Sequence, residues 1–417
     1  MDDDRLFILA SPNEIKDGKV TDIYFIRTLE ILKKDGLADT YVNAEVSVSS
    51  FPKRPIKYPW AILGGLRDVA KLFEGLKVDI DAMPEGTLFF DKDINGIRMP
   101  VMNIKGPYGE FLIYETPMLG FLAAGTGFAT KAARIRKAAG DKALILSFGA
   151  RRNHPILAPF IDFYAYVGGC DGVSVVVSAE KFLNKKPSGT MPHSLLIIYR
   201  HKMGDHKYGW MAFDKYMPSE VPRILLADTF LDEVEEALRG VETIGVDRIW
   251  GVRFDTPGSR RGDFSSIVRE AIWKLKSRGY DRVKIFVSGG LDEDTIPDLV
   301  KAGAYGFGVG SSIANAPFVD FALDITAIRE NDEWKPLTKR GKIDGIKQVW
   351  RCWRDNGSFY DIVLREGEKP DCDNAEPLLK PLIRNGKIVM EFPDPDEERR
   401  YVLDQLKAID LNKKPWE

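Results

Sequence analysis

The stretch that decides the fold is Val283-Lys284-Ile285-Phe286-Val287-Ser288-Gly289-Gly290, followed after residues 292–302 by Tyr305-Gly306-Phe307-Gly308-Val309-Gly310-Ser311-Ser312. Each apolar run predicts a β-strand and the segment between them predicts a helix, so the pattern indicates a βαβ unit. Glycine lets backbone N–H groups approach a ligand closely, and a helix N-terminus attracts anions. Paired glycine loops at the carboxyl ends of parallel strands bind phosphate in (β/α) barrels. One such loop alone would favour an ordinary tight turn, whereas two in succession favour a phosphate-binding barrel.

The same alternation of strands and helices extends through the middle of the chain. Apolar, β-branched runs predict strands at 143–148, 172–177, 194–199, 223–227, 248–254, 283–287 and 305–309. Such runs separated by helical patterns predict a parallel sheet covered on both faces. With at least six of these units, a closed or nearly closed barrel is favoured over an open sheet.

The two ends of the chain do not show this regular alternation of strands and helices. Helices are predicted over 22–33, 60–73 and 118–138, a strand over 41–51, short hairpin strands over 86–112, and a final helix over 396–409. The predicted fold class is therefore α/β: an irregular (β/α) barrel over 139–326, preceded by an N-terminal α+β domain of the α/β-sandwich kind over 1–138. A C-terminal extension over 327–417 completes the chain and could pack on the N-terminal domain.

Composition excludes several classes of protein. The 417 residues carry a net charge of −2 and are 44% hydrophobic, which is typical of a globular protein and gives no basic excess for nucleic-acid binding. Residues 1–5 are acidic where a signal peptide would be basic and then apolar, and no apolar run is long enough to span a bilayer. Three cysteines, Cys170, Cys352 and Cys372, do not make a disulfide framework, so a reducing cytoplasm is expected.

Charged residues gather at the predicted strand ends, where barrel enzymes carry their chemistry. The segments 148–154, 228–230 and 251–263 contain Arg151, Arg152, Arg253, Arg260 and Arg261, with Asp228 and Asp255 among them. Guanidinium groups bind carboxylate or phosphate in a bidentate manner, and aspartates suit Mg²⁺ bound to phosphates. Any one arginine pair, taken alone, favours solvated surface charge at the start of a helix. Five arginines at one barrel mouth favour an anionic, polyphosphate substrate.

His193 follows Gly189-Thr190 and precedes an apolar run, so we expect it at the mouth of the barrel. A single histidine near a strand is as compatible with a structural role as with a functional one. The spacing of the histidines shows no zinc pattern.

Seven short segments, taken in order, resemble nicotinate phosphoribosyltransferases of the archaeal type, within the type II phosphoribosyltransferases. They are Thr21-Asp22-Ile23-Tyr24, Glu115-Thr116-Pro117, Phe148-Gly149-Ala150-Arg151-Arg152, Gly189-Thr190-Met191-Pro192-His193, Gly251-Val252-Arg253-Phe254-Asp255-Thr256, Ser288-Gly289-Gly290-Leu291-Asp292 and Lys339-Arg340-Gly341-Lys342. The resemblance implies an N-terminal α/β domain, an irregular barrel and a C-terminal extension. It also implies a homodimer or higher oligomer, in which each active site joins one barrel to the neighbour's N-terminal domain.

The implied reaction converts nicotinate and phosphoribosyl pyrophosphate to nicotinate mononucleotide and pyrophosphate, in cytoplasmic NAD salvage. Many members couple it to ATP hydrolysis, as ligases do, so ATP and Mg²⁺ are expected, with Asp228 and Asp255 as magnesium candidates. By resemblance, Tyr24 and Phe148 would sandwich the pyridine ring, and Arg151 or Arg152 would bind the carboxylate. Thr190 and Arg253 would contact nucleotide or phosphate. His193 matches the phosphorylated histidine and joins Arg253 and Asp255 as a candidate catalytic residue. The glycine loops would hold the ribose 5-phosphate through Ser288, Gly289, Gly290, Gly308, Gly310 and Ser311.

The tail departs from the family pattern at its cysteines. Some archaeal relatives carry a four-cysteine zinc knuckle there, whereas this chain keeps one cysteine of each pair, Cys352 and Cys372. Two thiolates make a poor structural zinc site, so we predict no zinc.

Other functions remain open at this point. A nicotinamide or quinolinate phosphoribosyltransferase would share the barrel, although the two carboxylates of quinolinate would need more cationic residues around the ring. A phosphosugar isomerase or aldolase would explain the glycine loops but not Tyr24, Phe148 and the arginines together. A phosphate-binding scaffold without catalysis is the remaining alternative.

Overall fold

The computed structural model describes residues 7–52 and 58–417. The acidic segment 1–5, which is unlike a signal peptide, lies outside the described residues. The chain divides into two compact units, Met1–Thr130 with Pro317–Glu417, and Lys131–Ala316. No helix in the described part of the chain is both long and apolar enough to cross a bilayer.

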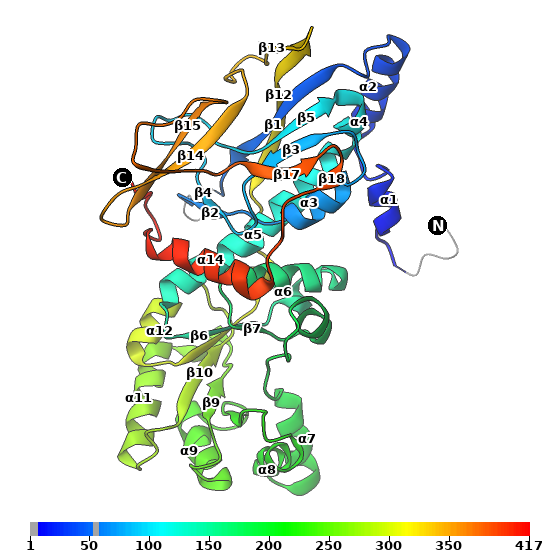
Figure 1. Ribbon diagram of the computed structural model, residues 1–417. Helices are drawn as coiled ribbons and strands as arrows, with labels where there is room; N and C mark the ends of the chain where they lie inside the picture. Colours follow the sequence, from blue (N-terminus) through cyan, green and yellow to red (C-terminus); the bar gives the residue numbers. More distant parts are fainter. Residues whose placement is uncertain (1–6, 53–57) are drawn as a thin grey trace. The chain divides into compact units, whose positions relative to one another are not determined.

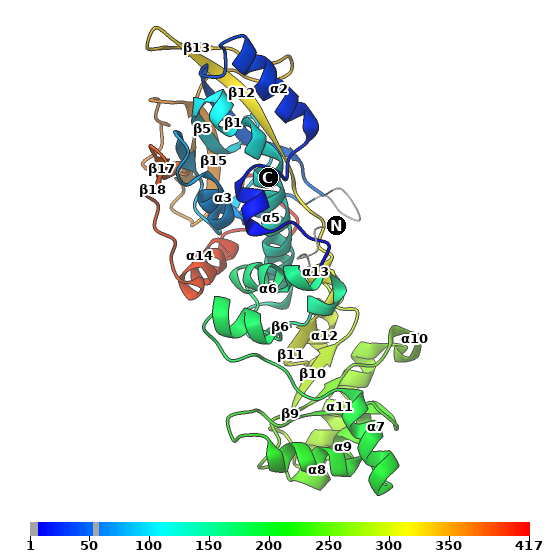
Figure 2. The same cartoon turned by 90° about the vertical axis from the view of Figure 1, so that its right-hand side faces the viewer.

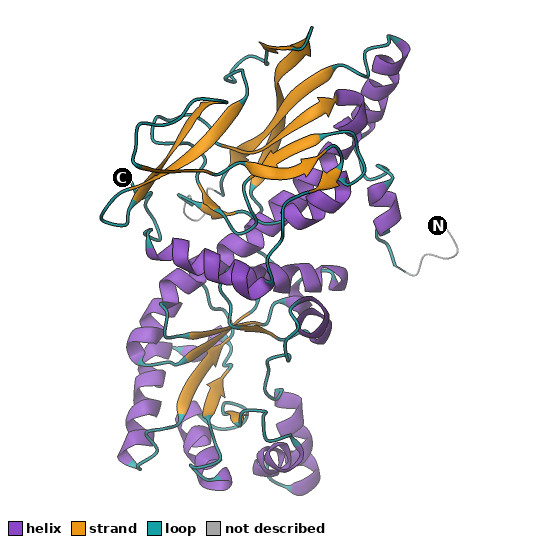
Figure 3. Cartoon of the chain, in the orientation of Figure 1, coloured by secondary structure: helices purple, strands orange, loops and turns teal. Residues whose placement is uncertain are grey.

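The first unit is built on a seven-stranded antiparallel sheet (Figure 3). Its strands lie in the order β13 (Glu333–Pro336), β12 (Asp320–Glu330), β1 (Tyr41–Ser50), β5 (Pro100–Pro107), β3 (Asp79–Ala82), β17 (Lys380–Arg384) and β18 (Lys387–Ile388). In β1 the alternating residues Val42, Ala44, Val46 and Val48 are all buried, which confirms the strand predicted over 41–51. Strands from both ends of the chain interleave, because β12 pairs with β1 and β17 pairs with β3.

The remaining elements of this unit are helices and short strands. They are α1 (Pro12–Lys16), α2 (Ile23–Lys34), β2 (Ala61–Ile62), α3 (Leu66–Phe73), β4 (Leu88–Phe89), α4 (Tyr108–Phe111), η1 (Leu112–Tyr114), α14 (Pro395–Lys407) and most of α5 (Glu115–Ala139). The predictions of α2, α5 and α14 are confirmed. The helix predicted over 60–73 begins only at Leu66, because Gly65 has a φ of 95° and ends the preceding extended segment.

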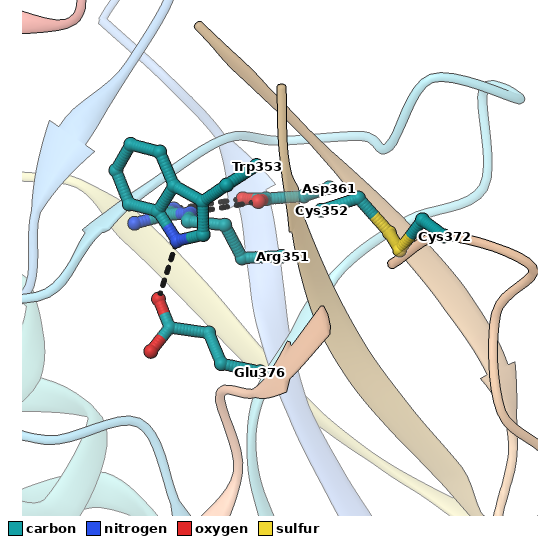
Figure 4. Close-up of a disulfide and its surroundings, with 6 residues drawn as sticks. All are labelled: Arg351, Cys352, Trp353, Asp361, Cys372 and Glu376. Carbon is teal, nitrogen blue, oxygen red and sulfur yellow. Dashed lines mark hydrogen bonds and ion pairs between the residues drawn. A yellow bond between two sulfur atoms is a disulfide. The ribbon is translucent and has the colours of Figure 1, made fainter. Parts of the chain in front are cut away.

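A smaller sheet in the same unit carries a disulfide (Figure 4). Its order is β15 (Phe359–Arg365), β14 (Lys347–Trp353) and β16 (Asn374–Pro377). Cys352 in β14 pairs in register with Ala375, which brings Cys372 close enough for the two sulfurs to bond, with a Cα–Cα distance of 6.2 Å. The expectation that the cysteines would stay reduced is therefore wrong for this pair. The number of cysteines could not reveal this pairing, because it depends on the register of two antiparallel strands.

The second unit contains a parallel sheet of six strands (Figure 1). Their order is β7 (Gly172–Val173), β6 (Leu144–Ser147), β11 (Gly306–Val309), β10 (Lys284–Ser288), β9 (Gly251–Phe254) and β8 (Ile224–Leu226). The parallel α/β class is confirmed, and so is the βαβ unit: β10, α12 (Ile296–Ala302) and β11 follow one another. Ser288 lies in register with Gly308, so the two glycine loops leave the sheet side by side.

One predicted strand of this unit is a helix. Residues 194–199 belong to α7 (His193–Met203), where Leu196 is buried while Ile197 and Ile198 are exposed. A short apolar run does not distinguish a strand from a helix by its period, and that ambiguity produced the error. The strands β7 and β8 are left at opposite edges, and no hydrogen-bonded ladder joins them within the described residues. The barrel is irregular for this reason.

Longer helices surround the sheet. In the order α12, α11 (Phe264–Ser277), α9 (Glu233–Ile244), α8 (Lys207–Tyr216) and α7, each packs against the next, as Figure 2 allows the reader to follow. The other helical segments are η2 (Ala150–Arg152), η3 (Pro155–Leu157), α6 (Ala158–Val167), η4 (Ser178–Phe182), α10 (Gly258–Arg261) and α13 (Ser311–Ala314). The connections at the carboxyl ends of the strands build the site described next.

Candidate active site

A cavity of about 480 Å³ opens at the carboxyl ends of the parallel strands in the second unit. Thirteen predicted site residues line it: Phe148, Arg151, Arg152, Thr190, His193, Arg253, Asp255, Ser288, Gly289, Gly290, Gly308, Gly310 and Ser311. The structure thus brings together segments that are far apart in the sequence. Strand order explains this convergence, because β6, β11, β10 and β9 are neighbours in one sheet.

One wall of the cavity consists of the two glycine loops. Gly289 and Gly290 have φ values of 87° and 69°, which side chains rarely adopt, so this turn requires glycine. A Cβ on Gly289 would lie 2.9 Å from the guanidinium of Arg261, which donates a hydrogen bond of 2.8 Å to the carbonyl of Ser288. Arg261 therefore supports the loop from behind and does not line the cavity.

Arg253 connects three of the converging segments. Its Nε donates to Thr190 Oγ1 at 3.1 Å, its Nη2 to the carbonyl of Met191 at 2.9 Å, and its Nη1 to Ser288 Oγ at 2.9 Å. Nη1 also lies 3.2 Å from Asp255 Oδ2. A planar guanidinium held by this many partners has little freedom to reorient, so its positive charge is fixed at the cavity wall.

His193 begins α7 and pairs with a buried carboxylate. Its Nε2 lies 3.2 Å from Oδ1 of Asp228, whose side chain is only 2% exposed. The other oxygen of Asp228 accepts from the backbone N–H of Asp255 and lies 3.0 Å from Thr256 Oγ1. The hydrogen bond to Asp228 raises the pKa of His193 above its usual value, while partial burial opposes the rise. Because a carboxylate only accepts, Nε2 carries the proton and the lone pair of Nδ1 is left as the nucleophilic position.

The wall next to the second glycine loop contains Phe148, at the end of β6, and the exposed Arg151 and Arg152 in η2. Gly308 is in contact with the Phe148 ring so closely that a Cβ added there would overlap it. An aromatic face beside two guanidinium groups suits a flat ring that carries a carboxylate.

Four predicted residues, counting Arg261, lie outside the cavity lining. Arg260 is exposed on α10 and is absent from the cavity lining, so the expected cluster of five arginines is reduced to three at the wall, with Arg261 behind it. Asp228 contacts His193 without lining the cavity. Tyr24 belongs to α2 of the first unit, where its side chain is 56% exposed.

Comparison with known proteins agrees with this geometry. The family models for the N-terminal and C-terminal domains of quinolinate phosphoribosyl transferase match residues 22–124 and 128–324. A nicotinate phosphoribosyltransferase of Mycobacterium tuberculosis is 30% identical over 79% of this chain and 69% of its own length. The chain belongs to the nicotinate phosphoribosyltransferase family, within the type II phosphoribosyltransferases. A relative from Bacillus subtilis, also named nicotinate phosphoribosyltransferase, is 28% identical over 93% of this chain and 88% of its own. The crystal structure of nicotinate-nucleotide pyrophosphorylase from Pyrococcus furiosus has a TM-score of 0.88 at 47% identity, covering 97% of this chain and 98% of that one.

Sequence reasoning missed several residues of this phosphoribosyltransferase site. Ser174, Gly189, Met191 and Pro192 also line the cavity. Ser174 was missed because the strand predicted over 172–177 ends at Val173, which turns the next residue into a loop position at the cavity. The apolar pattern did not indicate where this strand ends.

The residues present fit the Mg²⁺ that the family implies. Mg²⁺ usually keeps several waters and is bound by one or two carboxylates together with substrate phosphates. Asp255 presents such a carboxylate at the cavity, with Oδ1 accepting from Ser288 Oγ at 2.8 Å. Within the described residues, no group of three or more His, Cys, Asp or Glu side chains could form an all-protein metal cage.

Proposed function

We propose that this protein transfers the phosphoribosyl group of phosphoribosyl pyrophosphate to nicotinate, forming nicotinate mononucleotide and pyrophosphate in NAD salvage. The observation that carries the proposal is the convergence of two kinds of wall on one cavity. The glycine loops suit a sugar phosphate, and Phe148 with Arg151 and Arg152 suits an aromatic carboxylate. The names of the relatives from Mycobacterium tuberculosis and Bacillus subtilis support nicotinate as the acceptor.

The chemistry follows from charge placement. The pyridine nitrogen attacks the anomeric carbon of the ribose while the bond from that carbon to pyrophosphate breaks, so positive charge develops on the sugar and negative charge on the leaving group. Arg253 is held rigidly at the cavity wall and stabilises the negative charge, so catalysis is mainly electrostatics and positioning. Asp255 would hold Mg²⁺ together with the substrate phosphates, and the bound ion would neutralise further phosphate charge. No protein nucleophile is needed at the sugar.

The pyridine ring would stack on Phe148 while its carboxylate meets Arg151 or Arg152. The second aromatic face would come from Tyr24 of a second copy of the chain, which makes the functional unit a homodimer or a higher oligomer with shared sites. The exposure of Tyr24 on α2 supports this assignment, because the side chain is available to a partner.

ATP coupling is the second part of the proposal. Nδ1 of His193 attacks the γ-phosphorus of ATP, the bond from that phosphorus to ADP breaks, and water later hydrolyses the phosphohistidine to phosphate. The contact between Nε2 and Asp228 supports this role, since the carboxylate stabilises the positive charge that the imidazole gains on phosphorylation.

The first experiment measures pyrophosphate release with phosphoribosyl pyrophosphate and each of nicotinate, nicotinamide and quinolinate, with and without ATP. Nicotinate should be the preferred acceptor. Carbon dioxide release with quinolinate in preference to nicotinate turnover would instead assign the quinolinate reaction, and no turnover of any pyridine would leave a phosphate-binding scaffold.

The second experiment follows acid-labile label from γ-labelled ATP on the protein. Label should appear on the wild type, vanish in His193→Ala and persist in His201→Ala, which alters an exposed histidine of the same helix. Label that survives in His193→Ala would refute the phosphohistidine.

A further inference from the structure

A buried glutamate holds the loop that presents Asp228 to His193. This Asp228 loop, residues 228–231, follows β8 and leads into α9. Glu236 of α9 is 0% exposed and its carboxylate accepts three backbone hydrogen bonds from the loop. Oε2 accepts from the N–H of Thr229 at 2.7 Å, and Oε1 accepts from the N–H groups of Phe230 at 2.8 Å and Leu231 at 3.0 Å.

The side-chain contacts of Asp228 do not by themselves fix its position. Thr256 Oγ1 lies 3.0 Å from Asp228 Oδ2 but only 2.6 Å from Oε1 of Glu233, and a hydroxyl has one proton to donate. When Thr256 donates to the nearer Glu233, Asp228 keeps the backbone N–H of Asp255 and the imidazole of His193. The backbone of the Asp228 loop must then determine where its carboxylate lies.

A buried carboxylate is costly to place unless strong hydrogen bonds compensate it. Here the compensating donors all belong to the Asp228 loop, and His206 closes the other side of the carboxylate, with Nε2 3.3 Å from Oε1. The His206 ring also packs 5.3 Å from the ring of Phe230, between centroids. The loop is therefore held by its N–H groups and by one of its side chains.

We propose that Glu236 is a positioning residue: by binding three N–H groups of the Asp228 loop, it aims the Asp228 carboxylate at Nε2 of His193 and so keeps Nδ1 available for phosphorylation. The kinetic consequence depends on the proposed phosphohistidine, but the structural consequence for the His193 tautomer does not.

Glu236→Gln is the most informative variant because, in either orientation of its side-chain amide, the NH₂ group faces a backbone N–H. With the amide oxygen at the Oε1 position, the NH₂ group opposes Thr229, the residue next to Asp228. With the oxygen at the Oε2 position, it opposes Phe230 and Leu231. Glu235→Gln is the matched control, since Glu235 is an exposed residue of the same helical turn and the same charge is removed near the same helix end.

The decisive measurement is the tautomer of His193 in protein labelled with ¹⁵N-histidine, without substrates and at a pH where the imidazole is neutral. The chain has only four histidines, so assignment by single substitutions is practical. The wild type and Glu235→Gln should show the proton on Nε2. Glu236→Gln should show a mixture of the two tautomers, a readout that a uniform loss of stability would not produce.

Kinetics provide the second readout. In Glu236→Gln, phosphohistidine formation should slow at least about tenfold, because misplacing a reacting group by a fraction of an ångström carries a penalty of that order. The KM for nicotinate should stay unchanged, since Phe148, Arg151 and Arg152 lie on a different wall.

A wild-type tautomer in Glu236→Gln overturns the proposal. If that variant does not fold, Glu236→Asp decides: it keeps the charge but withdraws the carboxylate by one methylene, so the same tautomer mixture is expected and an unchanged tautomer refutes the idea. If no phosphohistidine forms even in the wild type, the ATP part of the proposed function fails, while the tautomer comparison still tests Glu236.

Discussion

Gly308 is the residue at which the two walls of the cavity meet. It lies in register with Ser288 of the neighbouring glycine loop and contacts the ring of Phe148 from the other side. A side chain at this position would reach the ring and also lie 3.0 Å from Cβ of Ser288, so it has no room to relax. The absence of a single Cβ therefore positions the aromatic face that we assign to the pyridine.

We expect Gly308→Ala to displace the Phe148 ring and raise the KM for nicotinate about tenfold, the equivalent of one lost aromatic contact. Steady-state kinetics with nicotinate as the varied substrate measure the effect. Gly258→Ala is the control, because a Cβ there meets no described atom within 4 Å. Equal KM values in the two variants would contradict the assignment of Phe148.

Asp228 makes the phosphorylation of His193 dependent on pH. Its hydrogen bond raises the pKa of His193, and the protonated ring has no lone pair on Nδ1, so phosphorylation of the wild type should fall as pH drops through the raised pKa. In Asp228→Asn this acid limb should move to lower pH, while the maximal rate falls about a hundredfold because proton placement is lost. A pH profile of phosphohistidine formation tests both.

The same pair affects stability with a defined sign. A raised pKa means that the folded state binds the proton more tightly, so this stabilisation is complete below the ordinary histidine pKa and is lost as pH rises through the raised one. Asp228→Asn should therefore lose more unfolding free energy in acid than in mild alkali. Denaturant unfolding at two pH values measures both losses, and equal losses would show that the pair contributes nothing.

At the scale of elements, the parallel unit was largely predictable and its exception has a physical reason. The six strands consist of short apolar, β-branched runs, which are typical of parallel strands buried on both faces. Glycine turns mark the ends of β10 and β11. The run at 195–198 is equally apolar, but it forms about one turn of α7, which leaves Ile197 and Ile198 exposed. Glu236 was not predictable, because Glu233, Glu235 and Glu236 are the same residue type in one helical turn, and only the fold distinguishes their surroundings.

The disulfide between β14 and the segment before β16 should stabilise the first unit. It closes a loop with a sequence separation of 20, and crosslinks of this span contribute about 3 kcal/mol by restricting the unfolded chain. Cys352→Ser should lower the melting temperature, and a dithiol reductant should lower that of the wild type by a similar amount. The reductant should have no further effect on Cys352→Ser; an additional shift would point to a different target.

At the scale of the whole molecule, the candidate residues are divided between the two units. Tyr24 lies in the first and the cavity lies in the second, and our proposal joins them through a second copy of the chain. A site shared between copies, as we propose, would leave no trace in the pattern of a single chain, so sequence order could not place Tyr24.

Mixing Tyr24→Ala with Arg253→Ala protein, at a nicotinate concentration far below the KM of the Tyr24 variant, should restore activity well above that of either variant alone. If dimers reassort at random, half are mixed and one of the two sites in each mixed dimer has both residues intact, so about a quarter of wild-type activity is expected. Each variant reassociated with itself is the control. Mixtures that stay as inactive as their parents, despite proven subunit exchange, would rule out shared sites.

The interleaving of both chain ends in the seven-stranded sheet has a consequence for synthesis on the ribosome. The edge of β1 that binds β12 emerges early, but its partner is made only after about 270 further residues, which takes roughly 15–55 s at ordinary elongation rates. During that interval the nascent chain displays an unpaired hydrophobic strand edge, a surface prone to aggregation. Production of this protein should therefore benefit from cotranslational chaperones that shield the early strands until the tail arrives.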